Sequence, residues 1–283
     1  MKKKIGFIDL FIDEWHANNY PNWFKTSNLS SEFEVSLAWE QAPAGGKPLN
    51  EWCQAMGITA GKSIEQVVEN CDVICILAPS NPEVHEHLAQ IPLRSGKPVY
   101  IDKPFAPDRA TAERLFELAD KFDTPLMSSS ALRFGTEILN AKNDVFLNQK
   151  VLFAGARGGG RSFEEYSIHQ VEMIVSLMGI GAKHVMQCGN QTTNHMVIDY
   201  DDDRRATITL NPGIPFAVSA CGENNTLALD KMSDYFPNLI NAMLEFFSSR
   251  ISPVKREETI EIAAIVASGI EALKTQKQWI KVK

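Results

Sequence analysis

The chain has 283 residues, and 28 Lys and Arg against 35 Asp and Glu give it a formal net charge of −7, which excludes a nucleic-acid binder that relies on a basic surface. Hydrophobic residues make up 44% of the chain and charged residues 22%, a balance that excludes general disorder and allows about two domains with buried cores. The five cysteines form an odd set without a Cys-x-x-Cys pair, which argues against a disulfide framework or a zinc knuckle.

The apolar run after the basic start MKKK is interrupted by Asp9 and ended by Asp13 and Glu14, so it does not match a signal peptide. No other stretch of the sequence reaches the roughly 18 apolar residues that a membrane helix needs. We therefore expect a cytoplasmic protein without membrane or nucleic-acid partners.

The first part of the chain alternates between short apolar runs and helical patterns. The runs KIGFIDL, FEVSLAW, CDVICILA, KPVYID and TPLMSS are typical of buried parallel strands. Between them, SIEQVVEN, PEVHEHLAQIPLRSG and APDRATAERLFELADKFD repeat their apolar positions at helical spacing. This rhythm predicts an α/β domain over residues 1–127 with a Rossmann-type, doubly wound parallel sheet.

After residue 127 the pattern changes to closely spaced strands. KVLFAGARGG and the helix EEYSIHQVEMIVSLMG are followed by AKHVMQCG, TNHMVIDYD, RRATITLN and FAVSACG. Consecutive strands with short turns predict a mainly antiparallel sheet. We therefore predict an α+β domain over residues 128–283, closed by helices near 234–249 and 256–273 and by a short strand, WIKV.

Two motifs in this order resemble a known family. The strand KPVYID runs into Asp102-Lys103-Pro104, and the helix EEYSIHQVEMIVSLMG carries Glu165 four residues before His169. They resemble the Glu-Lys-Pro and Asp-x-x-x-His motifs of the Gfo/Idh/MocA family, the relatives of glucose-fructose oxidoreductase and inositol dehydrogenase. The resemblance extends over nearly the whole chain. It implies an oxidoreductase that transfers a hydride between NAD or NADP and a CH-OH group of a sugar, polyol or related small molecule.

The residues themselves support a reaction of this kind. Lys103 follows a parallel strand, at the sheet edge where ligands bind in doubly wound folds. Glu165, His169 and Glu172 share one helix face because their spacing is i, i+4 and i+7. Alcohol oxidation needs a base for the hydroxyl proton and a cation near the developing charge. We predict Lys103, His169 and Glu165 as catalytic residues, and we assign substrate contacts to His16, Arg133, Arg157 and Glu172.

The phosphate-binding turn departs from the expected pattern. After the first strand, Asp9, Phe11 and Glu14 stand where a dinucleotide-binding fingerprint has its three glycines. Pro21, with Asn18 or Asn19 as a cap, favours a first helix that starts late, after a long polar loop. For a cofactor held by an altered turn, we predict contacts from Asp9, Phe11, Ile12, Glu40, Pro79, Asn81, His85, Asp102 and Lys103.

Other interpretations remain open. Lys103 can project into solvent, and His169 can be a buried histidine with a satisfied hydrogen bond. The chain can be a ligand-binding or regulatory module that has lost its nucleotide, or a cofactor-free or metal-assisted lyase or isomerase. A metal on the Glu-His-Glu stripe is the minor alternative, and we predict no metal site. The apolar alternation of the second sheet predicts a homodimer or homotetramer that associates through it.

Overall fold

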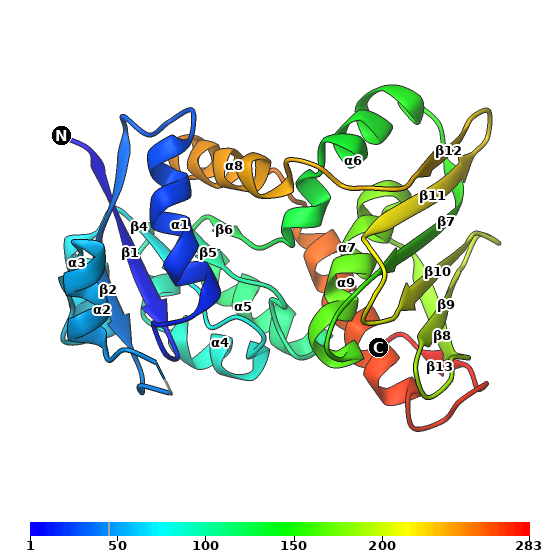
Figure 1. The fold of residues 1–283 in the computed structure, drawn as a ribbon, viewed down its shortest axis with the longest axis horizontal. Helices are drawn as coiled ribbons and strands as arrows, with labels where there is room; N and C mark the ends of the chain where they lie inside the picture. Colours follow the sequence, from blue (N-terminus) through cyan, green and yellow to red (C-terminus); the bar gives the residue numbers. More distant parts are fainter. Residues whose placement is uncertain (45) are drawn as a thin grey trace. The chain divides into compact units, whose positions relative to one another are not determined.

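The computed structural model describes residues 1–44 and 46–283 and divides the chain into two compact units (Figure 1). Unit 1 comprises Met1–Ala106, Ala110–Ser128 and Leu239–Lys255. Unit 2 comprises Pro107–Arg109, Ser129–Asn238 and Arg256–Lys283. Each unit is described by itself.

Unit 1 is built on a six-stranded parallel sheet of order β3-β2-β1-β4-β5-β6. From β1 the strand order first runs outward to β2 and β3, and it then continues on the other side of β1 with β4, β5 and β6. The point between β1 and β4 is the topological switch point of a doubly wound fold, and it confirms the predicted Rossmann-type sheet. The central strands are short and almost wholly buried, as the continuous apolar runs require. The strands are β1 (Lys3–Asp9), β2 (Phe33–Glu40), β3 (Thr59–Ala60), β4 (Val73–Ile76), β5 (Val99–Ile101) and β6 (Leu126–Met127).

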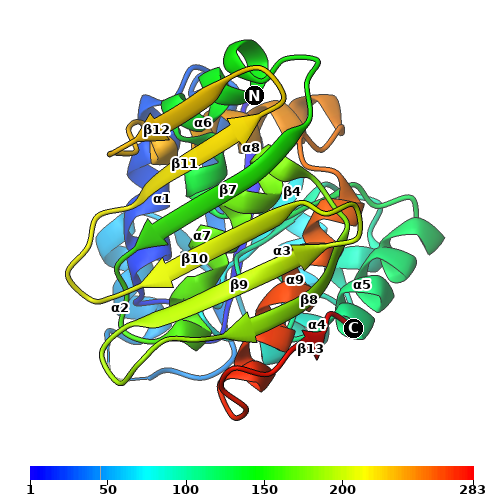
Figure 2. The ribbon, with the colours of Figure 1, turned by 90° about the vertical axis from the view of Figure 1, so that its right-hand side faces the viewer.

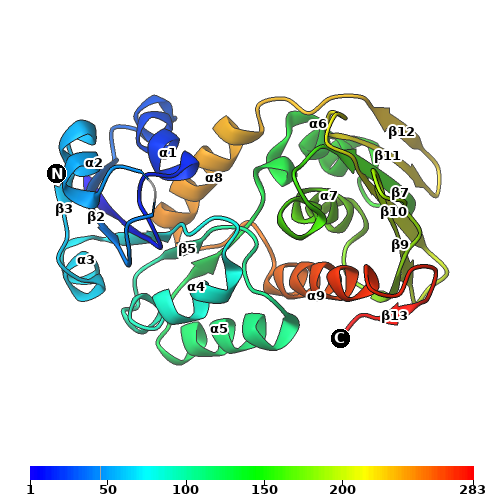
Figure 3. The ribbon, with the colours of Figure 1, turned by 60° about the horizontal axis from the view of Figure 1, so that its bottom comes forward.

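Helices cover both faces of this sheet, with α1 and α8 on one face and α3, α4 and α5 on the other (Figure 3). The helix α8 comes from far along the chain and packs here through Phe247, whose ring centroid lies 6.2 Å from that of Phe33 on β2. The helical elements of unit 1 are α1 (Trp15–Thr26), α2 (Leu49–Met56), α3 (Ile64–Asn70), α4 (Pro82–Leu88), the 3₁₀ turn η1 (Pro92–Arg94), α5 (Arg109–Lys121) and α8 (Tyr235–Ser249).

The predicted late start of the first helix is wrong. Helix α1 begins at Trp15, because the carboxylate of Glu14 caps it by accepting the backbone N–H groups of His16 and Ala17. Pro21 lies inside the helix and is buried, so it removes one donor without ending the helix. The chain from Asp9 to the helix is therefore a short turn and not a long polar loop.

Unit 2 is built on a seven-stranded mixed sheet of order β12-β11-β7-β10-β9-β8-β13 (Figure 2). All its strand pairs are antiparallel except β7 with β10, which is parallel, so the prediction of a mainly antiparallel sheet is confirmed. Strands β9 and β10 are consecutive and antiparallel, so they form a hairpin. The strands are β7 (Val151–Gly158), β8 (Ala182–Gln187), β9 (Asn194–Tyr200), β10 (Arg205–Leu210), β11 (Ala217–Gly222), β12 (Thr226–Leu229) and β13 (Ile280–Lys281).

The core of unit 2 lies between this sheet and two long helices, α7 and α9, which pack against each other and against the strands. Ser162 caps α7 by accepting the N–H of Glu165, and Gly179 follows its last residue. The helical elements are η2 (Ala131–Phe134), α6 (Thr136–Asn140), the π-helical turn η3 (Ala141–Val145), α7 (Phe163–Met178) and α9 (Arg256–Ala272).

The division into units differs from the predicted domains at one helix. The predicted change at residues 127 and 128 lies next to the observed change at Ser128 and Ser129. Residues 239–255, which we assigned to the second domain, belong instead to unit 1. The amphipathic pattern of α8 shows that one of its faces is buried, but a pattern does not name the sheet that buries it.

Candidate active site

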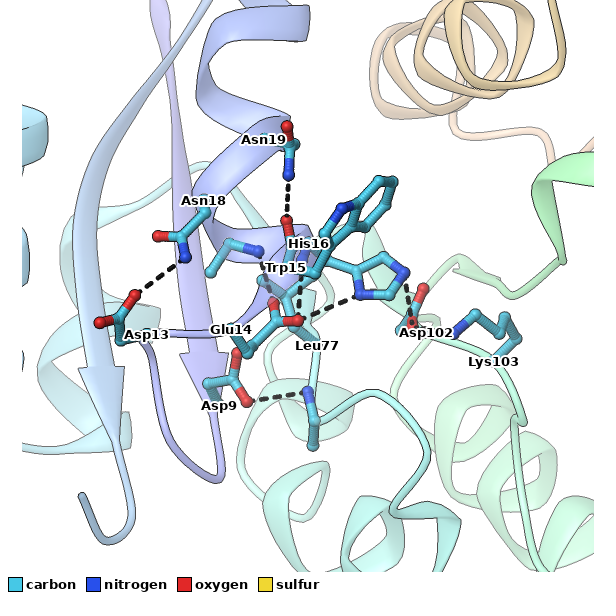
Figure 4. A network of polar contacts seen from close by, with 12 residues as sticks. Asp9, Asp13, Glu14, Trp15, His16, Asn18, Asn19, Leu77, Asp102 and Lys103 are labelled. Carbon is cyan, nitrogen blue, oxygen red and sulfur yellow. Dashed lines mark hydrogen bonds and ion pairs between the residues drawn. The ribbon is translucent and has the colours of Figure 1, made fainter. Parts of the chain in front are cut away.

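Three ionisable side chains of unit 1 meet at the carboxyl end of β5 (Figure 4). Asp102 follows the strand directly, and its Oδ2 atom lies 3.5 Å from Lys103 Nζ and 3.8 Å from His16 Nε2. The side chain of Asp102 is 1% exposed, whereas those of Lys103 and His16 are 12% and 10% exposed. The Asp102 carboxylate is thus buried, whereas the side chains of Lys103 and His16 remain partly accessible to solvent.

Asp102 is held as an anion between these two groups. Burial by itself raises the pKa of this carboxyl, but His16, Lys103 and His85, together with a hydrogen bond from Tyr100, outweigh it and lower the pKa below its usual value. Tyr100 Oη donates to Oδ1 at 3.1 Å. Oδ2 accepts no hydrogen bond from any of the described residues, although it faces both neighbouring nitrogens. The site therefore concentrates one negative charge beneath two basic side chains.

His16 is fixed from the opposite side by Glu14. Its Nδ1 atom lies 3.1 Å from Glu14 Oε2, so the Nε2 atom is the one directed toward Asp102. The rings of Trp15 and Tyr20 pack edge-on against the imidazole, with centroids 5.0 and 5.5 Å away. An imidazole held between two carboxylates in this way can exchange a proton through Nε2.

Glu14 also occupies the place where a pyrophosphate would bind. A dinucleotide in a Rossmann domain takes hydrogen bonds from backbone N–H groups at the start of the first helix. Here Glu14 Oε2 accepts the N–H of His16 at 2.8 Å, and Oε1 accepts the N–H of Ala17. The N–H of Asn18 donates to the carbonyl oxygen of Glu14 at 2.9 Å. The first turn of α1 thus uses its donors within the chain.

Asp9 places a second carboxylate beside the first. It ends β1, is fully buried, and accepts the N–H groups of Leu10 at 2.7 Å and Ala78 at 3.0 Å through Oδ1. Burial, and after it the charge of Glu14, raise the pKa of Asp9 well above its ordinary value, although its hydrogen bonds oppose the shift. A pyrophosphate does not fit this turn as it stands, because two acidic groups hold the donors that it would need.

Glu40, one of the predicted cofactor contacts, is used internally as well. Glu40 ends β2, and its two carboxylate oxygens accept the N–H groups of Ile12 and Leu49, each at 2.9 Å. Ile12 is fully buried, whereas Phe11 is partly exposed in the turn. Contacts of Glu40, Ile12 and Phe11 with a nucleotide stay predictions, and the observed role of Glu40 is to hold two loops together.

The predicted contacts after β4 form a tight turn. Ala78 and Ser80 have φ values of 37° and 64°, and Pro79 stands between them. Asn81 precedes α4, and its Nδ2 donates to Glu83 at 3.2 Å. His85 is fully buried: its Nδ1 lies 3.0 Å from the carbonyl oxygen of Phe105, and its Nε2 lies 3.2 Å from those of Leu77 and Ala78. The buried imidazole of His85 therefore stabilises the turn through its contacts with these carbonyl oxygens.

In unit 2, His169 lies in the middle of α7, and its Nδ1 is 2.7 Å from the hydroxyl of Ser130. The ring of Phe216 packs edge-on against it, with centroids 5.5 Å apart. Glu165, which we expected to orient this histidine, forms an ion pair with Arg161 at 3.0 Å. A hydroxyl thus holds Nδ1. The convergence of His169 with Lys103 of unit 1 stays a prediction.

Arg133 and Glu172, two predicted substrate contacts, belong to a buried ion cluster. Arg133 donates through Nε to Glu172 Oε1 and through Nη1 to Glu258 at 2.6 Å. Ser129 Oγ donates to Glu172 at 2.9 Å. Arg133 and Glu172 are at most 4% exposed, so their charges neutralise each other inside the unit. Arg157, on β7, is exposed.

No group of three or more His, Cys, Asp or Glu residues in the described part of the chain is arranged to hold a metal ion. Among the same residues, no helix has both the length and the apolarity needed to cross a bilayer. The carboxylates near His16 instead bind backbone N–H groups and the imidazole.

Comparison with known proteins identifies the family. The family model described as "Oxidoreductase family, NAD-binding Rossmann fold" matches residues 11–129, which include the turn after β1 and the Asp102-Lys103-Pro104 step. Through residues 11–129, the chain belongs to the Gfo/Idh/MocA family. Its fold and its general class, an oxidoreductase family with an NAD-binding fold, are those that the two sequence motifs implied.

Two curated relatives are distant and longer. Dehydrogenase aclE of Aspergillus oryzae is 24% identical over 148 residues, which cover 49% of this chain and 38% of that protein. An uncharacterized oxidoreductase of Schizosaccharomyces pombe is 26% identical over 114 residues, which cover 40% of this chain and 31% of that protein. The matches thus span well under half of each relative.

Solved structures of the Gfo/Idh/MocA fold match the whole chain. Scyllo-inositol dehydrogenase from Lactobacillus casei, with bound NAD(H) and scyllo-inositol, has a TM-score of 0.81 at 14% identity and covers 100% of this chain and 99% of its own. A probable dehydrogenase from Thermotoga maritima has a TM-score of 0.80 at 16% identity, with 99% and 98% covered. At these identities the likeness shows the fold alone.

Sequence reasoning missed three side chains that shape the site. Tyr100 points inward from β5 and donates to Asp102, and Ser130 lies in the segment that follows β6. Glu14 was recognised as a replaced glycine but not as a helix cap. Only the cap had a usable signal, because an acidic residue directly before a helix is a favourable neighbour of its N-terminus.

Proposed function

We propose that the protein acts on a small polyhydroxy compound and transfers a proton at one of its hydroxyl groups or at the carbon next to a carbonyl group. The observation that supports this most directly is the Asp102 carboxylate beneath His16 Nε2 and Lys103 Nζ, at 3.8 and 3.5 Å. A sugar or polyol is the compound class that the family comparison supports, since one neighbour of this fold binds scyllo-inositol.

Each group has a separate part in such a reaction. The Lys103 ammonium donates hydrogen bonds to a ligand oxygen and stabilises negative charge that develops there. His16 takes or returns the proton through Nε2, while Glu14 at Nδ1 fixes the orientation of its ring. Asp102 holds both side chains in place and stabilises the imidazolium while it exists. In an isomerisation without an oxidant, the base removes a proton from the carbon next to a carbonyl group and returns it to the former carbonyl carbon, while the hydroxyl proton passes to the former carbonyl oxygen.

Hydride transfer to NAD or NADP is the second candidate. The family match and the NAD(H) bound in the Lactobacillus casei neighbour favour it. Asp9 and Glu14 oppose it, because they occupy the pyrophosphate turn. The proton step at His16 is common to both candidates.

Deuterium exchange separates the two candidates. The protein is incubated in D₂O with a panel of sugars and polyols, with and without NAD or NADP, and the carbon-bound hydrogens are followed by NMR. Exchange without nucleotide that falls at least about 100-fold in His16→Gln and Lys103→Met supports proton transfer alone. His87→Gln, an exposed histidine on α4, is the matched control. Turnover that requires nucleotide supports the second candidate, and exchange unchanged in His16→Gln contradicts the assignment of the base.

A further inference from the structure

We infer that the carboxyl groups of Glu14 and Asp9 fill the pyrophosphate-binding turn, so that this Rossmann domain does not take a free dinucleotide there. It favours the nucleotide-free proton transfer at the His16 site over hydride transfer to NAD or NADP, because only the second reaction needs a bound dinucleotide. Three steps support it: the use of the donors, the charge of the turn and the bracing of the loop.

The donors come first. A phosphate at a helix N-terminus is bound by N–H groups that the helix itself leaves unpaired. In α1, the N–H groups of His16 and Ala17 are both taken by the Glu14 carboxylate, one by each oxygen. The N–H of Ala78, on the neighbouring turn after β4, is taken by Asp9. A bound pyrophosphate would have to displace both carboxylates to reach these groups.

Charge acts in the same direction. The N-terminal end of a helix carries a partial positive charge of roughly half a unit, and the full negative charge of Glu14 already exceeds it. Asp9 lies close enough for the charge of Glu14 to raise its pKa, and its Oδ2 accepts no hydrogen bond from the described residues. A pyrophosphate would meet acidic groups in a turn where the glycines of the usual fingerprint leave bare backbone.

The loop is also braced against rearrangement. Glu40 accepts the N–H of Ile12 from within the turn, and Asp13 accepts the N–H of Lys47 at 2.7 Å and the side-chain amide of Asn18 at 2.9 Å. Displacing the Glu14 carboxylate therefore requires movement of a turn in which Ile12 and Asp13 are both held by hydrogen bonds. The turn therefore does more than lack glycines, because its side chains form hydrogen bonds that hold it in this conformation.

A double substitution tests the inference while preserving the local hydrogen bonds. In Asp9→Asn, the side-chain oxygen can still accept the N–H groups of Leu10 and Ala78. In Glu14→Ser, a good N-cap residue replaces a larger charged one. Asp13→Asn is the matched control, because it removes one charge from the same turn without freeing the α1 donors.

The readout is binding of NADH and NADPH, followed by nucleotide fluorescence, and of inorganic pyrophosphate, followed by calorimetry. We expect no saturation of the natural chain or of Asp13→Asn at millimolar concentrations, and at least about tenfold tighter binding by the double variant. Circular dichroism and the melting temperature establish that each variant is folded. If the double variant does not fold, the single variant Asp9→Asn replaces it in the binding measurements.

Two outcomes would overturn the inference. One is tight binding by the natural chain, with a Kd for either dinucleotide below about 100 μM, since the turn would then be open in solution. The other is a folded double variant, or a folded Asp9→Asn variant in its place, that binds nucleotide and pyrophosphate no better than Asp13→Asn does. The carboxylates would then not be the cause of the exclusion.

Discussion

The buried ion cluster of unit 2 gives the sharpest test of a structural role. Arg133 donates to Glu172 and Glu258, and the side chains of Arg133 and Glu172 are 4% and 3% exposed. In Arg133→Met, a side chain of similar length removes the cation and leaves Glu172 with the Ser129 hydroxyl as its remaining hydrogen-bond donor among those described above.

The expected loss follows from this burial. Removing one partner of a buried pair leaves an uncompensated charge, which costs about 3–5 kcal/mol of unfolding free energy. In Arg133→Met/Glu172→Gln, the orphaned charge is removed as well, so we expect the double variant to recover a large part of that loss. Glu258→Gln is the milder comparison, because the side chain of Glu258 is 15% exposed.

Urea unfolding of these three variants, of the single variant Glu172→Gln and of the natural chain, followed by circular dichroism, measures these differences. Because the chain has two units, the transition of unit 2 is identified from the one that shifts in Arg133→Met. A loss below about 1 kcal/mol for Arg133→Met, with strictly additive effects in the double variant, would refute the reasoning. Arg133 and Glu172 would then be free for the substrate contacts that the sequence predicted.

Three further substitutions test other parts of the structure. Because the pKa of Asp9 is raised, the protonated form contributes stability that is fully present below its ordinary pKa of 3.8 and is lost as the pH rises through the raised value. Asp9→Asn should therefore flatten the fall of unfolding free energy toward alkaline pH, measured by urea titration at several pH values. Gly6→Ala should cost about 1–3 kcal/mol in the same assay, because the new Cβ would lie 2.4 Å from Val67 Cγ1, and an unchanged midpoint would contradict the packing. Ser130→Ala removes the partner of His169 Nδ1 and should cost about 1 kcal/mol and shift the imidazole NMR signals of His169, whereas unchanged signals would argue against this bond in solution.

The sequence was sufficient to predict both sheets. Short apolar runs bounded by turn residues are buried in any parallel sheet, so five of the six strands of unit 1 follow from composition and spacing, whereas the two-residue strand β3 was not predicted. The second sheet follows from alternation in the same way. The pattern could not predict which sheet α8 packs against. Its apolar face fits either unit, and only long-range packing assigns it to unit 1.

For the site, strand position was informative and local helix spacing was not. Lys103 and Asp102 were found because the end of a parallel strand is a defined place in the fold. Glu165 and His169 share a helix face, yet Glu165 pairs with Arg161 and Ser130 contacts the imidazole, because neighbours outside the helix compete for each side chain. The predicted association through the second sheet stays a prediction.

The return of α8 to the first unit affects how the protein can fold during synthesis. The ring of Phe33 on β2 packs against Phe247, Asn241 accepts the N–H of Asn28, and Arg250 donates to the carbonyl of Gly96. A nascent chain that ends near residue 128 lacks all three contacts, and of the two helices only α1 then covers that face of its sheet. The nucleotide-type domain therefore matures only after the ribosome has released residue 255, and a gene fragment that encodes the first half alone should yield an aggregating product.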